Sequence, residues 1–506
     1  MTLTLENFLA LLPLLITAAT TVVVMLAIAV RRNHWWTATL TVIGLNSALL
    51  AIAYDVFAPL VVHELFPSIV VTPLFQIPQT VTPLFVVDGF SLFFSALILA
   101  AALGATTLTH AYIESFKRNR EEMYLLITIA TAGAIVLTMA HHMASLFIGL
   151  EMMSIALYGM ISYTYDRERS LEATIKYIIL SATASSIMLF GMALIYAQLG
   201  TLSFAEIGAK VGNDPAMLVV IGGMMLVIGL LFKLSLAPFH LWTPDVYEGA
   251  PAPVGVFLAT AAKVSVFAVL VRFVIIEASG ASSMPFKLTL VFVACLSMLN
   301  GNLLALKQNN IKRMLGYSSI AHFGYLFALI LLGGRQFGVE GFAAYLAIYV
   351  ITALAAFGVV TLMSTADAER DADTLHDYHG LFWHRPFLAS IFTVALFSLA
   401  GIPLTAGFIG KFYVVMAALA AGFWGWIALC FVVLGSAISI YFYLRTIISM
   451  FMTNKDLVPF DAKMDWGQHT GGIVVFLSAA LIIIIGIVPN PLIFIAQVSQ
   501  YMWVAH

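Results

Sequence analysis

Four lysines and one glutamate interrupt stretches of the sequence that are otherwise apolar enough to cross a membrane. The lysines are Lys176, Lys233, Lys263 and Lys411, and the carboxylate is Glu151. A charged side chain at bilayer depth costs about 2.5–3.5 kcal/mol on insertion scales, so such residues are rare, face the protein interior and mark ion or proton paths. One acid and four bases in the apolar zone predict a protein that moves protons or cations.

The surroundings of these five residues differ. No residue of opposite charge lies within one helical turn of Glu151, Lys233, Lys263 or Lys411. Burial favours a neutral amine and a nearby carboxylate favours a charged one, so these lysines can change protonation state near neutral pH. We expect Glu151 either to tune a neighbouring lysine or to form a structural ion pair. Lys176 follows Glu172 by one turn, a spacing that also simply stabilises helices.

Two histidines can extend such a path. His240 lies just past Pro238, and His322 lies about ten residues into another apolar segment. Histidine relays protons at physiological pH, but it also satisfies core contacts, and the sequence leaves both roles open.

Other polar residues fit structural roles. Asp88 precedes an apolar run and is expected to cap a helix N-terminus. The acidic stretch Asp367–Asp373 is expected to be a solvated loop, and His141 and His142 are expected at the surface of a short turn.

The composition is that of a membrane protein. The 506 residues are 62% hydrophobic and only 9% charged, with a mean hydropathy of +1.02, whereas soluble domains are about 25% charged. The two cysteines, Cys295 and Cys430, lie in apolar segments and are expected to be small core residues. The sequence contains no CxxC or haem-attachment motif, which predicts that this chain holds no redox cofactor and no metal.

Fourteen segments are long enough to span a bilayer, which takes about 20 apolar residues. Fifteen basic residues lie in alternate loops and four in the loops between them, the four lysines above completing the 23. The positive-inside rule places the first set in the cytoplasm, so both termini face outward. The spans are 8–30, 35–56, 89–108, 123–140, 142–163, 171–198, 216–243, 253–273, 288–306, 313–332, 341–363, 386–418, 423–450 and 470–494.

Two of these spans contain a proline that breaks the helix. Pro238 lies in 216–243, and Pro403 lies in 386–418, which as one straight helix would be about 50 Å long. Each broken span is the fourth of five in a unit, and interrupted helices at matching positions point to a transport site. The predicted fold is an all-α polytopic membrane protein with two inverted five-helix repeats, 123–273 and 288–450, three helices before them in 1–122 and a last span at 470–494.

Several motifs resemble a known family, the antiporter-like membrane subunits of respiratory complex I. They are "FIGLEMMSI", "SLEATIKYIILSATASS", "GLLFKLSLAPFHLWTPDVYEGAPAPV", "KRMLGYSSIAHFGY" and "GIPLTAGFIGKFY". The resemblance covers essentially the whole chain and is closest to the N branch, because position 411 is a lysine and no long amphipathic helix follows the last span.

The resemblance implies a function and its residues. The family's proton-relay positions match Glu151, Lys233, Lys263 and Lys411 here, and in the family the glutamate pairs with the lysine of the first broken span. On the residue arguments given above, Lys176, His322 and His240 remain candidates for the same relay. The chain would be a translocase subunit of NADH–quinone oxidoreductase in a bacterial inner membrane, with both termini periplasmic. It would move protons outward, driven by redox chemistry elsewhere in the complex.

The resemblance also implies partners. NADH, FMN, iron–sulfur clusters and quinone would be bound by other subunits, and this chain would contact subunit M, the small subunits A, J and K, and the lipid bilayer, but no nucleic acid. Two alternatives remain open from sequence alone: a subunit of a multi-subunit cation/proton antiporter, and a structural membrane scaffold without transport.

Overall fold

The structure, a computed structural model, describes residues 4–57, 75, 77–114, 116, 119–211, 216–273, 284–366, 368–452, 470–497 and 499. Before the first repeat it contains α1 (Leu5–Ala10), α2 (Leu12–Val30), α3 (His34–Ile52) with a π-helical extension η1 (Ala53–Phe57), strands β1 (Gln79–Thr82) and β2 (Phe85–Val87), and α5 (Gly89–Ile113).

The two predicted repeats and the last span are also helical. The first repeat contains α6 (Glu122–Met139), α7 (Met143–Ile161), η2 (Ser162–Thr164), α8 (Glu168–Leu199), α9 (Phe204–Lys210), α10 (Met217–Leu234), α11 (Trp242–Gly249), α12 (Ala252–Ala259) and α13 (Ala261–Val271). The second contains α14 (Met284–Leu306), α15 (Ile311–Leu332), α16 (Arg335–Leu362), η4 (Leu375–Tyr378), α17 (Leu381–His384), α18 (Pro386–Ala400), α19 (Ala406–Ala420) and α20 (Gly422–Phe451). The chain continues with α21 (Thr470–Ile487) and α22 (Asn490–Gln497).

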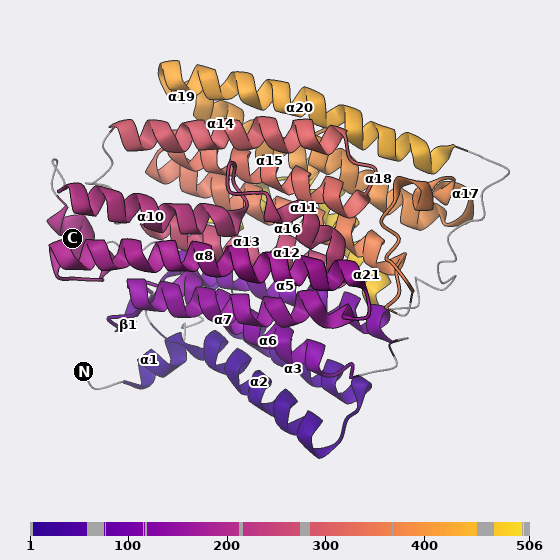
Figure 1. The fold of residues 1–506 in the computed structure, drawn as a ribbon, viewed down its shortest axis with the longest axis horizontal. Coiled ribbons are helices and arrows are strands. Elements are labelled where there is room, and N and C mark those ends of the chain that lie inside the picture. The colour runs from indigo at the N-terminus through magenta and orange to yellow at the C-terminus, as the bar shows by residue number, and fades with distance from the viewer. Residues whose placement is uncertain are drawn as a thin grey trace, which may run out of the picture.

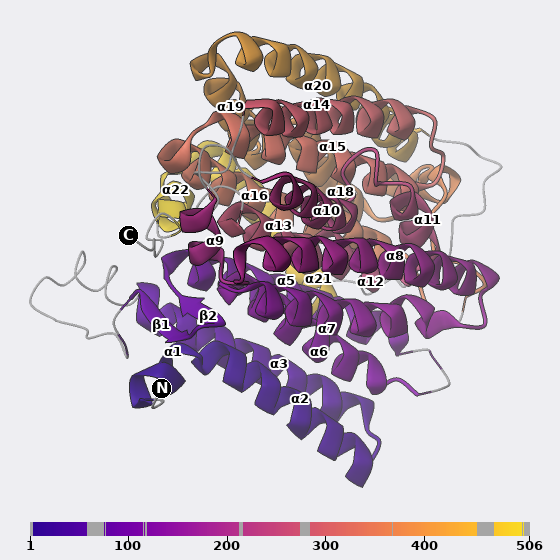
Figure 2. The same cartoon turned by 60° about the vertical axis from the view of Figure 1, so that its left-hand side comes forward.

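The membrane-spanning pattern agrees with the sequence. In the described residues, 13 helices are long and apolar enough to cross a bilayer, and the shorter apolar helices α18 and α19 make up the remaining predicted span. The long helices lie side by side in one bundle, with α2 and α3 along one edge and α19 and α20 along the opposite edge (Figure 1). Helix α1, the β1–β2 hairpin and α22 lie at the same end of this bundle (Figure 2), as an even number of spans requires.

Both predicted helix interruptions are present. Helix α10 ends before Ser235, which has a left-handed backbone (φ 63°), and the chain resumes helical structure at α11. Helix α18 ends before Gly401 (φ 80°), and α19 starts at Ala406. A third interruption was not predicted: Thr260 (φ −112°, ψ −91°) separates α12 from α13. Neither proline nor glycine occupies position 260, so the sequence carries no signal of that break.

The two ends of the bundle are built differently. At the hairpin end, isolated β-bridges join Phe85 to Ala140 and His142 to Ser203. His142 caps α7 by accepting a hydrogen bond from a backbone N–H, whereas His141 is only 6% exposed, so its predicted surface position is wrong. The strands were not predicted either, because they are very short.

At the other end, here called the basic end, lie the loops that carry most of the arginines. There the chain after α16 packs against the start of α15, and an isolated β-bridge joins Asn310 to Thr374.

Two helices of the first predicted repeat pack closely against each other. Helices α8 and α10 approach closely at Gly191 and Gly222, where a methyl group added to Gly191 would lie 2.5 Å from the carbonyl oxygen of Gly222. Small residues at such crossings let membrane helices pack backbone to backbone. This contact holds the lysine-bearing α10 against α8.

Candidate functional site

Lys233 lies in the last turn of the half-helix α10 and is 6% exposed. Its Nζ donates hydrogen bonds to Ser154 Oγ (2.7 Å) on α7 and to Ser181 Oγ (2.6 Å) on α8, and it lies 5.6 Å from the ring centroid of Tyr177. The C-terminal end of a helix carries partial negative charge, so the break in α10 gives this ammonium a favourable position.

Glu151 is half-buried rather than buried like the lysines, and its Oε1 accepts a hydrogen bond from Ser185 Oγ (2.6 Å) on α8. Over the residues the structure describes, it makes no direct ion pair with Lys233, so the predicted contact pair is wrong. The reason is geometric. Ser181 and Ser185 are one turn apart on α8, and each binds one of the two charged groups. Serine hydroxyls separate the carboxylate from the ammonium.

Lys263 lies in the first turn of α13, directly after the Thr260 break, and is 1% exposed. Its Nζ donates to Ser319 Oγ (2.5 Å) on α15 and lies 4.9 Å from the ring centroid of Phe323 and 5.8 Å from that of Tyr247. Its contacts are therefore a hydroxyl and two aromatic faces.

Lys411 lies in α19, the half of the second broken span that follows the break at Gly401, and is 7% exposed. Its Nζ donates to the carbonyl oxygen of Ala400 (2.7 Å), the last residue of the half-helix α18, and lies 5.5 Å from the ring centroid of Tyr325. Gly401 makes room for this lysine, because an added methyl group would lie 2.6 Å from its Cδ. The ammonium group of Lys411, like that of Lys233, therefore lies at the C-terminal end of a half-helix, which here is α18.

His322 is buried on α15, and its Nδ1 lies 2.9 Å from the hydroxyl of Tyr345. Its ring centroid is 5.8 Å from that of Tyr325, the same ring that faces Lys411. Ser319, His322 and Tyr325 follow at intervals of three residues, so they share one face of α15. This polar stripe connects the contacts of Lys263 to those of Lys411.

The sequence did not reveal that Ser319 binds Lys263, or that three other serines bind Lys233 and Glu151. Ser154, Ser181 and Ser185 bind the charged residues directly, yet serines at helix interfaces are usually packing groups. A signal was available, since Ser181 and Ser185 are spaced by one turn in "SATASS".

His240 lies in the link between α10 and α11 and is 6% exposed. The link and α11 carry four buried polar atoms that have no hydrogen-bond partner among the described residues: Ser235 Oγ, His240 Nδ1, Thr243 Oγ1 and Tyr247 Oη. Buried polar groups in native proteins are normally satisfied, often by ordered water. The broken helix therefore presents a polar, hydratable surface to the core.

The predicted burial of Lys176 is wrong. Its side chain is 42% exposed, and its Nζ bonds Glu172 and Asp245, both at 2.7 Å. Asp245 also pairs with Arg313 (2.7 Å), which in turn pairs with Glu248. Lys176 thus belongs to a charge network near the basic end, which links α8, α11 and α15.

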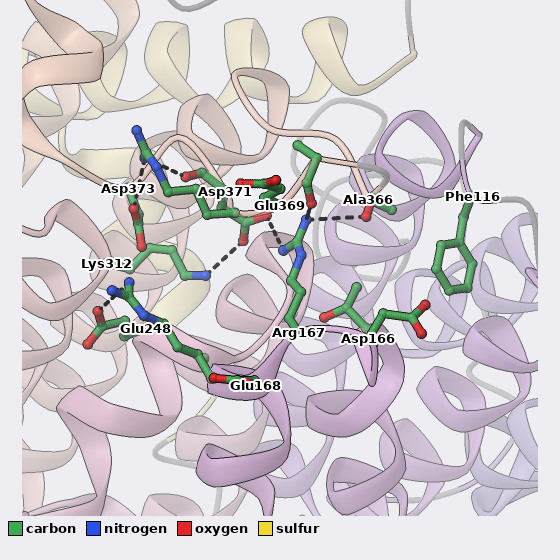
Figure 3. A pocket seen from close by; sticks show the side chains of 15 residues that line it. Phe116, Asp166, Arg167, Glu168, Glu248, Lys312, Ala366, Glu369, Asp371 and Asp373 are labelled. Atoms are coloured by element: carbon green, nitrogen blue, oxygen red, sulfur yellow. Dashed lines mark hydrogen bonds and ion pairs between the residues drawn. The ribbon is translucent and has the colours of Figure 1, made fainter.

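The stretch predicted to be a solvated acidic loop is partly buried instead, and Asp367 lies outside the described residues. Asp371 is 2% exposed and accepts hydrogen bonds from Arg167, Lys312 and the hydroxyl of Tyr112, each at 2.8 Å. Burial alone would raise the pKa of Asp371, but Lys312 and Arg167 outweigh it and hold this pKa below its ordinary value. These contacts form part of the wall of a cavity of about 710 Å³ at the basic end (Figure 3).

The predicted helix cap at Asp88 is confirmed. Its Oδ1 accepts from the Ser91 backbone N–H (2.8 Å). The same carboxylate forms a fully buried two-point pair with Arg272 (2.8 and 2.9 Å), a partner that sequence reasoning missed.

Within the described residues no group of three or more His, Cys, Asp or Glu side chains is arranged to hold a metal ion. Cys295 is buried as predicted, but Cys430 is exposed, so its predicted core position is wrong.

Comparisons with known proteins show the family of this chain. The family described as NADH:quinone oxidoreductase/Mrp antiporter, transmembrane, matches residues 140–454. The chain is 52% identical over 495 residues to NADH-quinone oxidoreductase subunit N of Ectopseudomonas mendocina, an alignment that covers 97% of this chain and 96% of that protein.

Solved structures share the fold. A chain of respiratory complex I from Thermus thermophilus with bound aureothin matches with a TM-score of 0.78 and 31% identity, over 96% of this chain and 99% of that one. A chain of the Mrp complex from Dietzia sp. matches in fold with a TM-score of 0.79 and 20% identity, over 98% and 97% of the two chains. The chain therefore belongs to the NADH:quinone oxidoreductase/Mrp antiporter family of membrane proteins, in the branch of complex I subunit N.

Proposed function

We propose that this chain is a proton-translocating membrane subunit of NADH–quinone oxidoreductase. One observation carries the proposal: Lys233, Lys263 and Lys411 are each at most 7% exposed, and each donates to a neutral oxygen. In the part of the chain that the structure describes, none of the three forms an ion pair with a carboxylate. An ammonium without a countercharge at bilayer depth is costly, so the neutral amine competes with it and each lysine can accept and release a proton.

Glu151 is placed to control the first lysine. Because serines separate it from Lys233, the two charges interact through space rather than by contact. At an effective dielectric near 20, two unit charges interact by about 4 kcal/mol at a separation of about 4 Å and by about 2 kcal/mol at twice that separation. That is comparable to the roughly 2.3 kcal/mol needed to move one charge against 100 mV. A change at Glu151 can therefore bias whether Lys233 holds its proton.

The proton would pass from the first repeat to the second along α15. Lys263 contacts Ser319, His322 follows one turn later, and Tyr325 leads to Lys411. Lys411 lies in α19, which leads away from the basic end, so it is the last relay. We assign the basic end to the cytoplasm and the hairpin end, with both chain termini, to the periplasm.

The redox chemistry would take place elsewhere in the complex. We propose that NADH, FMN, iron–sulfur clusters and quinone bind to other subunits, and that this chain contacts subunit M and the small subunits A, J and K within the bacterial inner membrane. Its own residues supply a proton path, so its catalytic role is that of a translocase.

Lys263→Ala tests the proposal most directly. The measurement is NADH-driven acidification of inverted membrane vesicles that contain the assembled complex. We expect a large loss of proton pumping, because Lys263 is the link between the two repeats. Unchanged pumping in a fully assembled variant would support a scaffold role instead, and sodium movement coupled to protons would support the antiporter alternative.

A further inference from the structure

The cavity at the basic end has no part in the relay described so far. It is lined by the start of α8, the end of α11, the start of α15 and the segment between α16 and η4 (Figure 3). Exposed carboxylates, Asp166, Glu168 and Glu369, lie in its lining. The cavity therefore opens to water through a charged rim, which also contains the exposed Arg169, while its deeper wall contains the buried Asp371 and Asp373.

The two buried carboxylates differ in how strongly neighbouring donors stabilise their charged forms. Asp371 receives two close cationic donors and is fixed as an anion, as described above. Asp373 accepts from the amide of Asn310 (2.7 Å) and from Arg370 only at 3.3 Å. Burial raises the pKa of Asp373, and Lys312 and Asn310 only partly offset this. When the surroundings of two neighbouring carboxylates shift their pKa values in opposite directions, one can serve as a fixed charge and the other as a proton acceptor.

One face of α15 leads from this cavity towards Lys263. Lys312, which lines the cavity, lies two turns before Ser319 on α15, so both residues share the face of the polar stripe. Between them the ring of Tyr247 lies beside Gly316, with Tyr247 Cγ 3.5 Å from the position of an added methyl group, an ordinary contact distance. The Tyr247 ring faces Lys263, and its hydroxyl is one of the buried atoms without a protein partner.

We propose that this cavity is the site where protons are taken up from the adjoining water, with Asp373 as the uptake carboxylate and Tyr247 as the next group towards Lys263. The inference deepens the proposed function and rests on it. A hydronium ion gives its proton to the Asp373 carboxylate, which leaves water and a carboxylic acid. The acid then passes the proton through hydroxyl groups and water to the neutral amine of Lys263, and the carboxylate is restored.

The charged groups around Asp373 come from every neighbouring element. They are Lys312 from α15, Glu248 from α11, Arg167 from the start of α8, and Arg370, Asp371 and Asp377 from the same segment and η4. An uptake carboxylate matters most where protons are scarce, so its loss should slow pumping more at alkaline pH than at acidic pH.

The test measures the initial rate of NADH-driven proton pumping in inverted vesicles with the assembled complex, over a range of pH. For Asp373→Asn we expect a rate about threefold lower at about pH 8.5 and nearly unchanged at about pH 6, with recovery in Asp373→Glu. The matched control is Asp377→Asn. Asp377 also binds Arg370 and lies close by in the chain, but it does not line the cavity, so its profile should follow the unaltered complex.

The outcomes separate the two proposals. A normal rate at every pH in Asp373→Asn, or an equal loss at every pH, would overturn the uptake role while Lys263→Ala still abolishes pumping. Normal pumping in Lys263→Ala would overturn the proposed function itself. If the Asp373→Asn complex does not assemble, Tyr247→Phe is the deciding variant, because it keeps the packed ring and removes only the hydroxyl. A loss of pumping rate that is larger at alkaline pH supports the proton route through Tyr247, whereas a normal pH profile overturns it.

Discussion

Glu151 and Lys233 are held by hydroxyls one turn apart on the same helix, Ser185 and Ser181 of α8. The carboxylate and the ammonium therefore share a scaffold without touching. A rotation or shift of α8 would therefore change both hydrogen bonds together.

Replacing Glu151 by glutamine should lower proton pumping and coupled NADH–quinone turnover while assembly stays largely intact. The substitution keeps the hydrogen bond to Ser185 but removes the charge that biases Lys233. Vesicle acidification and turnover are measured on the same preparation. Glu172→Gln is the control, since Glu172 is an exposed carboxylate that pairs with Lys176. Normal pumping in an assembled Glu151→Gln complex would rule out the switch.

Lys233→Ala should be more damaging than Lys176→Ala. Lys233 is buried beside a helix break and binds two serines, whereas Lys176 is half-exposed and belongs to a redundant charge network. Exposed ion pairs contribute about 0–1 kcal/mol each, so loss of Lys176 should cost little. The pH gradient formed by vesicles carrying each variant gives the ranking, and the opposite order would show that Lys176 has a direct role.

Substitutions at Lys411 distinguish a proton relay from a fixed charge. Arginine keeps the charge but does not release its proton, and alanine removes both. If Lys411 must release a proton, both variants should fail to pump, and histidine should restore part of the activity. Full pumping by assembled Lys411→Arg would exclude proton release at this position.

Gly401→Ala should impair the second broken helix. The residue has a left-handed backbone (φ 80°), and the added methyl group would lie 2.6 Å from Lys411 Cδ. We expect a loss of about 1–3 kcal/mol of stability together with reduced pumping. Gly223→Ala is the matched control, because no atom lies within 4 Å of its added methyl group. Thermal unfolding and vesicle acidification of both variants check the contrast.

Asp371→Asn should lower the stability of the basic end by about 3–5 kcal/mol, the usual cost of breaking a buried ion pair. The pKa of Asp371 is below its ordinary value of 3.8 in the folded protein. Its stabilisation is therefore fully present above that value and is lost only as the pH falls through the lower, folded pKa. The difference in melting temperature from the unaltered protein should be constant between about pH 5 and pH 8. A difference that changes across this range would contradict the assignment of Asp371 as a fixed anion.

The sequence by itself determined the membrane class, the fourteen spans and the two proline-broken helices, because these depend on local composition and backbone chemistry. It also identified Lys233, Lys263 and Lys411 as buried lysines, since a lysine inside an apolar run is a strong local signal. The sequence did not predict the helix break at Thr260, because no residue there forbids a continuous helix.

Only the tertiary structure decided which groups meet. The serine bridge between Glu151 and Lys233, the exposure of Lys176, and the burial of Asp371 and Asp373 all depend on how helices far apart in the chain pack. A serine, an aspartate or a lysine has the same local sequence signature whether it faces lipid, water or a partner side chain. Its role follows from what the neighbouring helices bring to it, and helix packing sets those neighbours.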